Sequence, residues 1–330
     1  MHFQTIMSGL HPIDKRVLFE LGRDARQSYR EIAQRIKSKK EIVAYHVQDL
    51  IDRKVITKFV PVFSLNPLGI FSFKIYLRLH GLTKNAEEQL IQKLVQNPDL
   101  CWVAKGVGSW DLLLGMYAPD IVTFGHKKDE LLNTLSPYIE SYDITMIEDA
   151  LIFNRDYLTE KRSINRDAFI FGGKTTPMKL NDEEKKTLSL IKNNGRFAAL
   201  TLGKTLQEDP RTTFARIKKL EKRKIIQGYT VFLDLKKIGS ALHKLCISLS
   251  SHNATEIQRL TERIKQFPHV IHLIKAIGSW EFEIELEAHN PQIAHDITRT
   301  LKNEFPQTIK RIDSVIITEE EKIEFSPQTL

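Results

Sequence analysis

The amino-acid sequence predicts an α+β protein built from two tandem copies of one unit. Each unit is a winged or helix-turn-helix domain followed by a ferredoxin-like (βαββαβ) domain. Three observations predict this fold class: an internal repeat at a constant offset of 170 residues, three short helical patterns at the start of each copy, and alternating strand and helix patterns in the rest. A chain of 330 residues is long enough for several domains, each with its own core.

The repeat is read directly from aligned residues. Arg26 falls on Arg196, and the segment Arg53-Lys54-Val55-Ile56 falls on Arg223-Lys224-Ile225-Ile226. Further on, Gly108-Ser109-Trp110-Asp111 falls on Gly278-Ser279-Trp280-Glu281. No gap is needed over about 140 residues, so we interpret the repeat as a duplication.

The duplication and the composition along the chain set the expected domains. They are a first helix-turn-helix domain at 1–60, a first ferredoxin-like domain at 61–158, a linker at 159–179, a second helix-turn-helix domain at 180–230 and a second ferredoxin-like domain at 231–330. The linker is polar and basic and contains Gly172-Gly173, although Phe169-Ile170-Phe171 can dock elsewhere. Fully stretched it spans roughly 70 Å, so it permits pairing of the copies within a chain or between chains. We slightly favour pairing within a chain.

The start of each copy carries the pattern of three short helices with a tight turn before the third. Pro12 suits the first position of a helix, Asn181 and Glu184 form a capping box, and Asp209-Pro210 is a strong start for the third helix of the second copy. This is the arrangement of a helix-turn-helix unit, whose third helix reads DNA. The expected inward residues of the first copy are Ile13, Val17, Leu18, Leu21, Ile32, Ala33, Ile36, Val43, Val47 and Leu50.

The positive charge lies where such a unit would meet phosphates. The chain has a net charge of +8, while residues 10–59 carry +5, residues 180–229 carry +6, and the ferredoxin-like segments 60–158 and 230–330 carry −4 and −2. A single charged helix is usually only a solvated surface, but two aligned ones favour DNA binding. The candidate DNA contacts are Lys39, Lys40, Tyr45, His46 and Gln48 in the first reader helix, and Arg211, Arg216, Lys218, Lys219 and Lys222 in the second.

After each helix-turn-helix the pattern changes to strand, helix, two strands, helix and strand. Phe71 to Leu79 alternates apolar and polar residues, which predicts a half-buried strand, and Gly108-Ser109 lies at the tip of a hairpin. This order is that of a ferredoxin-like sandwich. One face of its sheet is covered by the helices, and we expect the sister copy or another chain to cover the other.

In these features the chain resembles the leucine-responsive/asparagine-regulator (Lrp/AsnC) family. The residues that carry the resemblance are Ile32-Ala33-x-x-Ile36 in the second helix, Gly106-Val107-Gly108-Ser109-Trp110-Asp111 in the hairpin, and Ile277-Gly278-Ser279-Trp280-Glu281 in the second copy. The chain departs from the family at the turn before the reader helix, where Lys37-Ser38-Lys39 and Gln207-Glu208-Asp209 replace glycine-hydrophobe-serine, and at Thr213, which replaces a buried valine. The second reader is therefore expected to be held less firmly, or to serve mainly for contacts with phosphates.

The resemblance implies a DNA-binding transcription regulator that responds to a small effector such as an amino acid. It implies effector-binding positions at Gly108, Asp111, Gly278 and Glu281, with glycine amides holding a carboxylate and the acid taking an ammonium group. The alternative is that these residues only form the turn. The expected partners are double-stranded DNA, an amino-acid-like effector and further copies of the chain that associate through the ferredoxin-like domains as a homodimer or a larger oligomer.

The main alternative is an enzyme. Siroheme decarboxylases are similar to this family, and their chemistry relies on a histidine and basic residues on the second strand of the sandwich, where His272, Lys275 and, in the first copy, Trp102 lie. We expect no catalytic, metal or cofactor site, because Cys101 and Cys246 do not match in the repeat and no catalytic grouping stands out. No segment approaches the roughly 18 apolar residues of a membrane helix and the N-terminus lacks a signal-peptide pattern, so a cytoplasmic location without membrane contact is expected.

Overall fold

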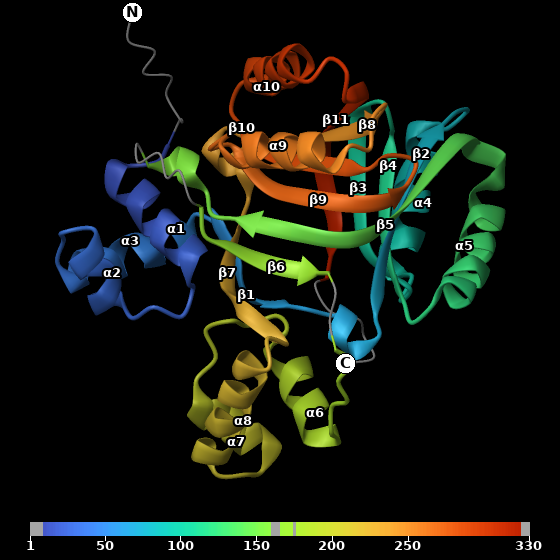
Figure 1. Cartoon of the computed structure of the whole chain (residues 1–330). Helices are drawn as coiled ribbons and strands as arrows, with labels where there is room; N and C mark the ends of the chain where they lie inside the picture. Colours follow the sequence, from blue (N-terminus) through green and yellow to red (C-terminus); the bar gives the residue numbers. More distant parts are fainter. Residues whose placement is uncertain (1–8, 160–165, 174–175, 325–330) are drawn as a thin grey trace, which may run out of the picture.

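The computed structural model describes residues 9–159, 166–173 and 176–324. Parts of the expected linker (160–165 and 174–175) and the outer ends of the first and last expected domains (1–8 and 325–330) lie outside the described residues. The α+β fold class is confirmed, and Figure 1 shows two three-helix units beside a central body of strands.

Each copy contributes the same order of elements. The first copy contains α1 (Pro12–Arg23), α2 (Tyr29–Arg35), α3 (Lys40–Asp52), β1 (Ile56–Phe63), β2 (Phe71–Leu79), α4 (Lys84–Gln96), β3 (Leu100–Gly108), β4 (Leu112–Ala118), α5 (Ile121–Leu135) and β5 (Ile139–Phe153). Strand β6 (Ala168–Gly172) lies within the segment expected as a linker. The second copy contains α6 (Asp182–Ile191), α7 (Ala199–Leu206), α8 (Pro210–Lys222), β7 (Ile226–Leu233), β8 (Ala241–Leu249), α9 (Ala254–Lys265), β9 (Val270–Gly278), β10 (Phe282–Ala288), α10 (Pro291–Glu304) and β11 (Ile309–Ile323).

The helices begin where local side chains satisfy their first amides. Pro12 is the first residue of α1, and Asn181 and Glu184 form a capping box at the start of α6. Asp209 caps α8, with Pro210 as its first residue. These starts confirm the expectations from the sequence, because capping depends on neighbours along the chain.

The two ferredoxin-like sheets join edge to edge into one closed ring. The strand order is β2-β4-β3-β11-β8-β10-β9-β5, and β5 also pairs with β2. At one joint Gly108 pairs with Val315, and at the other Gly278 pairs with Thr145, which are equivalent positions 170 residues apart. The two copies therefore pair within one chain about a pseudo-two-fold axis.

Closure of the ring changes the burial of its strands. On β2, the residues from Ser72 to Leu77 are all buried, so the expectation of a half-buried strand is wrong. The helices α4, α5, α9 and α10 cover the outside, as Figure 1 shows. Inside the ring, Tyr76, Trp110 and Trp280 pack together with ring centroids 4.7–5.1 Å apart. Among the described helices, none is long and apolar enough to cross a membrane.

A two-stranded ribbon connects the three-helix units to this body. Strand β1 follows α3 and strand β7 follows α8, and the two pair antiparallel with Val60 opposite its equivalent Thr230. Strand β6 extends the sheet beyond β5, with Asp149 opposite Gly172. The ribbon therefore lies on the pseudo-two-fold axis, directly between the two reader helices and the ring.

Candidate DNA-binding surface and central cavity

The first reader helix, α3, presents a polar face to solvent. Lys39, Lys40 and Gln48 are exposed, and Tyr45 is 68% exposed. The Gln48 side chain donates to Asp52 Oδ1 at 2.8 Å. His46 differs, because its Nδ1 lies 2.6 Å from Oδ1 of the buried Asp14 and only 15% of its side chain is exposed. The structure thus brings four of the five expected residues to the surface and places His46 against α1.

The second reader helix, α8, exposes more positive charge. Arg211 and Lys222 are exposed, and Lys218 and Lys219 are 58% and 64% exposed although they pair with Glu221 and Glu184. Arg216 is turned inward instead. Its guanidinium forms two bonds to Glu208, at 2.7 and 2.5 Å, and one to Thr187 at 3.0 Å. Four cations of α8 are therefore available to phosphates, while Arg216 holds the turn.

The turns before the two reader helices have the same backbone geometry, although neither contains the glycine that is usual in the family. Lys37 and Gln207 adopt φ angles of 54° and 55°, in the left-handed region. The following amides, of Ser38 and Glu208, donate back to the carbonyls of Ala33 and Gly203 at 2.8 and 2.9 Å. A side chain in this conformation costs roughly 1–2 kcal/mol. The surrounding contacts hold it in both copies.

Thr213 occupies the position of the buried Val43 and is itself fully buried. Its hydroxyl donates to Glu208 Oε1 at 2.6 Å, and the same carboxylate binds Arg216. The Arg216 guanidinium lowers the pKa of Glu208. A polar link between turn and reader therefore replaces the apolar contact of the first copy.

Two equivalent arginines join the helix-turn-helix units to each other. Arg26 donates to the carbonyls of Gly195 and Phe197, at 3.2 and 3.3 Å, and its guanidinium lies 3.9 Å from the centre of the Phe197 ring. Arg196 reciprocates by donating to the Gln27 carbonyl at 3.3 Å and lying over the ring of Tyr29. We call this pair the arginine clasp. It fixes the two readers relative to each other, a role that the repeat alignment alone did not reveal.

The hairpin positions expected to bind an effector have partners inside the chain. Asp111 accepts from the Leu79 amide at 2.8 Å, and Glu281 accepts from the Leu249 amide at 2.8 Å. Gly108 and Gly278 have φ angles of 135° and 143° and lie against the last strand of the other copy, where a Cβ would collide with carbonyl oxygens. The two glycines thus allow the copies to approach each other closely, whereas the two acids bond within their own copy.

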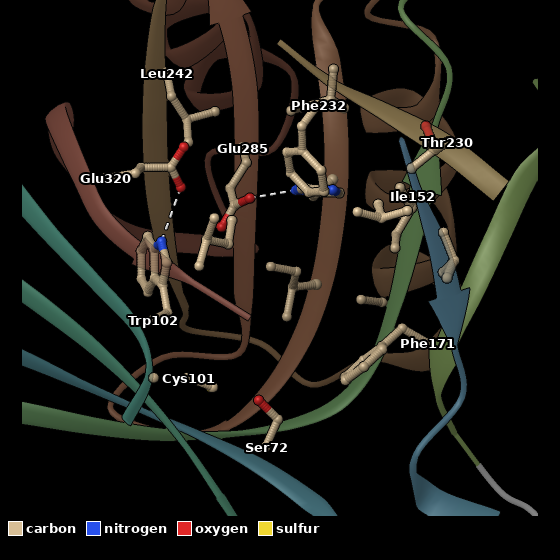
Figure 2. A pocket seen from close by; sticks show the side chains of 18 of the residues that line it. Ser72, Cys101, Trp102, Ile152, Phe171, Thr230, Phe232, Leu242, Glu285 and Glu320 are labelled. Carbon is tan, nitrogen blue, oxygen red and sulfur yellow. Dashed lines mark hydrogen bonds and ion pairs between the residues drawn. The ribbon is translucent and has the colours of Figure 1, made fainter. Parts of the chain in front are cut away.

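A cavity of about 210 Å³ lies between the ring and the ribbon. Figure 2 shows Ser72, Cys101 and Trp102 on one side, Leu242, Glu285 and Glu320 on another, and Ile152, Phe171, Thr230 and Phe232 around the remainder. Most lining side chains are apolar. The ionisable ones are Lys74, Arg155, His272, Glu285, Glu287, Glu320 and Glu324, besides the buried Cys101 and the half-buried Tyr117.

A buried cluster of opposite charges forms part of the cavity wall, because two of its four members, Lys74 and Glu285, line the cavity. Lys74 and its equivalent Lys244 both reach Glu283, at 2.7 and 3.0 Å, and both reach Glu285, at 3.4 and 2.5 Å. Although burial favours protonation, the two lysines outweigh it, so that the pKa of Glu283 falls to about 2 and the pKa of Glu285 lies well below its ordinary value. We call these four residues the buried charge cluster.

Some of the other ionisable groups of the cavity also have hydrogen-bond or ion-pair partners. His272 Nδ1 is hydrogen-bonded to Glu285. The Arg155 guanidinium binds Glu287 at 2.8 Å, and the hydroxyl of Tyr157 donates to the same carboxylate. Burial raises the pKa of Tyr157, so its proton remains in place.

Only part of the cavity lining was expected from the sequence. His272 and Trp102 line it, whereas Lys275 pairs with Glu148 at 2.7 Å on the exposed side. The acidic residues of β10 were missed, because alternating glutamates ordinarily indicate a solvent-facing side of a strand. The repeat could have indicated the buried face, because the equivalent positions on β4 are Leu113, Gly115 and Tyr117, which are not typical of a solvent-facing side.

Comparison with known proteins agrees with both parts of the fold. Residues 10–57 match the model of a winged helix-turn-helix DNA-binding family. An uncharacterized HTH-type transcriptional regulator of Pyrococcus furiosus is 30% identical over 139 residues, which cover 42% of this chain and 86% of that protein. The HTH-type transcriptional regulator LrpC of Bacillus subtilis is 24% identical over 136 residues, which cover 41% of this chain and 92% of that protein.

A solved structure extends the likeness to both copies at the level of the fold. The siroheme decarboxylase NirDL superposes with a TM-score of 0.63 and 13% sequence identity, covering 95% of this chain and 93% of that one. At this identity the likeness concerns the architecture alone. With the sequence matches to the regulators, the chain belongs to the Lrp/AsnC family.

Proposed function

We propose that the protein is a sequence-specific regulator of transcription that binds double-stranded DNA through α3 and α8. The observation that carries the proposal is the pair of exposed reader helices, held in one pseudo-symmetric frame by the β1–β7 ribbon and the arginine clasp. A fixed pair of readers suits a DNA site with two half-sites. The family membership supports the same conclusion.

The two readers divide the expected contacts. On α8, Arg211, Lys218 and Lys222 are suited to phosphates, which any sequence offers. On α3, Tyr45 and Gln48 are suited to base edges, where an amide recognises adenine. Because the exposed side chains differ, the proposed site consists of two unlike half-sites about one helical turn apart.

The test is selection of bound fragments from genomic DNA, followed by a salt titration on the selected site. With six to ten phosphate contacts, affinity should fall by roughly a thousandfold or more between 50 and 200 mM salt. Random duplex of the same length is the control. Absence of binding at low salt, or equal affinity for the selected and random duplexes, would refute the proposal.

A second candidate function is the enzymatic one, favoured by His272 in the cavity and by the fold likeness over the whole chain. The charge of the cavity lining argues against this enzymatic function. Four carboxylates line the cavity against Lys74 and Arg155, and both cations are already paired with carboxylates. A tetrapyrrole carrying many carboxylates would meet like charge there.

Absorbance titration with siroheme decides between the two functions. We expect no stoichiometric binding by the native chain and unchanged DNA binding by His272→Ala. Tight siroheme binding that is lost in His272→Ala, without DNA binding, would establish the enzyme instead.

We also propose a small effector, self-association of the chain and a cytoplasmic location. A small effector would regulate DNA binding, and further copies would associate through the outer surfaces of the ferredoxin-like domains, since their sheet edges are already paired within the chain. A cytoplasmic location goes with DNA as the partner. Sedimentation velocity of the chain with and without DNA measures the association directly.

A further inference from the structure

The central cavity has the size and lining of a ligand site. Its volume of about 210 Å³ is far above the roughly 10–15 Å³ that one water molecule needs. Apolar side chains such as Leu242, Ile152 and Phe171 supply most of its wall, and a few polar side chains, Glu285 and Glu320 among them, lie between the apolar ones (Figure 2). This combination is typical of sites for small organic molecules.

Glu320 is a carboxylate of the cavity that has no cationic partner among the described residues. It accepts from Trp102 Nε1 at 2.9 Å, and among the described residues no cation lies within ion-pair distance of it. The other carboxylates have cationic partners: Glu285 has Lys244, Glu287 has Arg155 and Glu324 has Lys322. The residue Glu320 as a whole is exposed, and the protein packed around its carboxyl group disfavours the charge and raises its pKa.

The side chain of Trp102 defines where an apolar group would lie. Its Nε1 is bound to Glu320, and a Cβ built on Gly115 would come within 2.9 Å of Trp102 Cβ. Glycine at this position therefore leaves room for the start of the Trp102 side chain. A ligand whose cation reaches Glu320 would place its apolar body between Trp102 and the ribbon.

We propose that this cavity binds a small organic cation, an amine with an apolar or aromatic body, whose charged nitrogen pairs with Glu320. An amino acid fits less well, because its carboxylate would enter a cavity lined by four glutamates. A polyanion fits least. The ligand class is therefore an amine without an acidic group.

The ribbon gives such a ligand a route to the DNA-binding surface. Residues of β1 and β7 form one wall of the cavity, and the first residues of these strands follow the ends of α3 and α8 by only a few positions. A ligand that shifts the ribbon would change the spacing of the two readers. This regulatory role rests on the proposed function, whereas the binding of the amine does not.

Three probes that share one ring and differ in charge test the chemistry. They are 2-phenylethylamine, phenylalanine and 3-phenylpropanoate, each titrated into the full chain by calorimetry. We expect the amine to bind with a Kd below ~1 mM and the other two at least about tenfold more weakly. Equal or tighter binding of the acid or the amino acid, or no binding of the amine at that concentration, would overturn the inference.

Two matched variants locate the site. Glu320→Gln keeps an acceptor for Trp102 and removes the charge, so amine affinity should fall at least about tenfold while the melting temperature is maintained or rises. Glu319→Gln makes the same change at the next residue, which pairs with Lys105 outside the cavity, and should leave amine affinity unchanged. Loss of affinity in Glu319→Gln, or none in Glu320→Gln, would contradict the assignment.

A third measurement separates this inference from the proposed function. DNA affinity is measured with and without saturating amine, and a change of about threefold or more is expected if the ligand is an effector. Amine binding without any DNA binding would refute only the proposed function. DNA binding without amine binding would refute only the cavity site.

Discussion

Strand β4 has Leu113, Gly115 and Tyr117 where strand β10 has Glu283, Glu285 and Glu287. Both strands have the same place in their copy and the same neighbours by symmetry. The lysines, in contrast, are symmetric, since Lys74 and Lys244 are equivalent. The second copy thus supplies the acids for the lysines of both, and duplication has allowed one frame to carry two different interiors.

The helix-turn-helix units differ in the same way. The first uses an apolar Val43 and exposes Tyr45 and Gln48, whereas the second uses Thr213 with Glu208 and exposes basic residues. The backbone turn is kept in both. Shape is therefore shared between the copies, and chemistry is divided between them.

The largest expected effect is on the buried charge cluster. Glu283→Leu introduces the residue type of β4 but leaves Lys74 and Lys244 with Glu285 alone, so the free energy of unfolding should fall by about 3–5 kcal/mol. Urea denaturation measures it. Adding Lys244→Met should recover part of the loss. A loss below about 1 kcal/mol for the single variant would mean that the cluster is not required for stability.

Acid should act on the same cluster. The folded pKa of Glu283, about 2, and that of Glu285 lie below their unfolded values of about 4.3. Their contribution to the free energy of unfolding is therefore present above about pH 4.3 and is lost as the pH falls toward 2. Urea midpoints between pH 7 and pH 3 measure this loss. The slope should be shallower in the Glu283→Leu, Lys244→Met double variant, and an unchanged slope would contradict the assignment.

The sequence predicted what depends on neighbours along the chain. Pro12 is the first residue of α1, and Asn181 and Asp209 cap their helices, as their patterns indicate. Both copies also have the expected order of strands and helices in their ferredoxin-like parts. Caps and periodicity are local, so they survive without knowledge of tertiary contacts.

What failed depends on contacts between distant segments. His46 and Arg216 were grouped with the exposed reader residues, but Asp14 and Glu208 hold them inward. Strand β2 was expected to be half-buried, but the sister copy covers its second face. The charged interior of β10 has the alternation of a surface strand, and only closure of the ring turns that face inward.

The comparison of the two readers predicts a smaller effect on DNA binding. Changing Arg211, Lys218 and Lys222 to alanine should weaken binding to all sequences by about one to two orders of magnitude and reduce the salt slope by about 2.7. Changing Tyr45 and Gln48 should instead relax preference in one half-site, by about 1–3 kcal/mol for each base that the variant no longer recognises. Filter binding to selected and mutated sites measures both. Identical effects of the two sets would show that the readers are equivalent.

The smallest expected effect concerns the turn of the second helix-turn-helix. Thr213→Val removes a buried hydroxyl that donates to Glu208, which keeps its two bonds to Arg216, so the free energy of unfolding should fall by only about 0.5–1.5 kcal/mol. The mirror change, Val43→Thr, should cost more, because the residue equivalent to Glu208 is Ser38 and offers no carboxylate. Urea denaturation of the two single variants measures both losses. Equal losses would mean that the polar link is incidental and that the two turns are held in the same way.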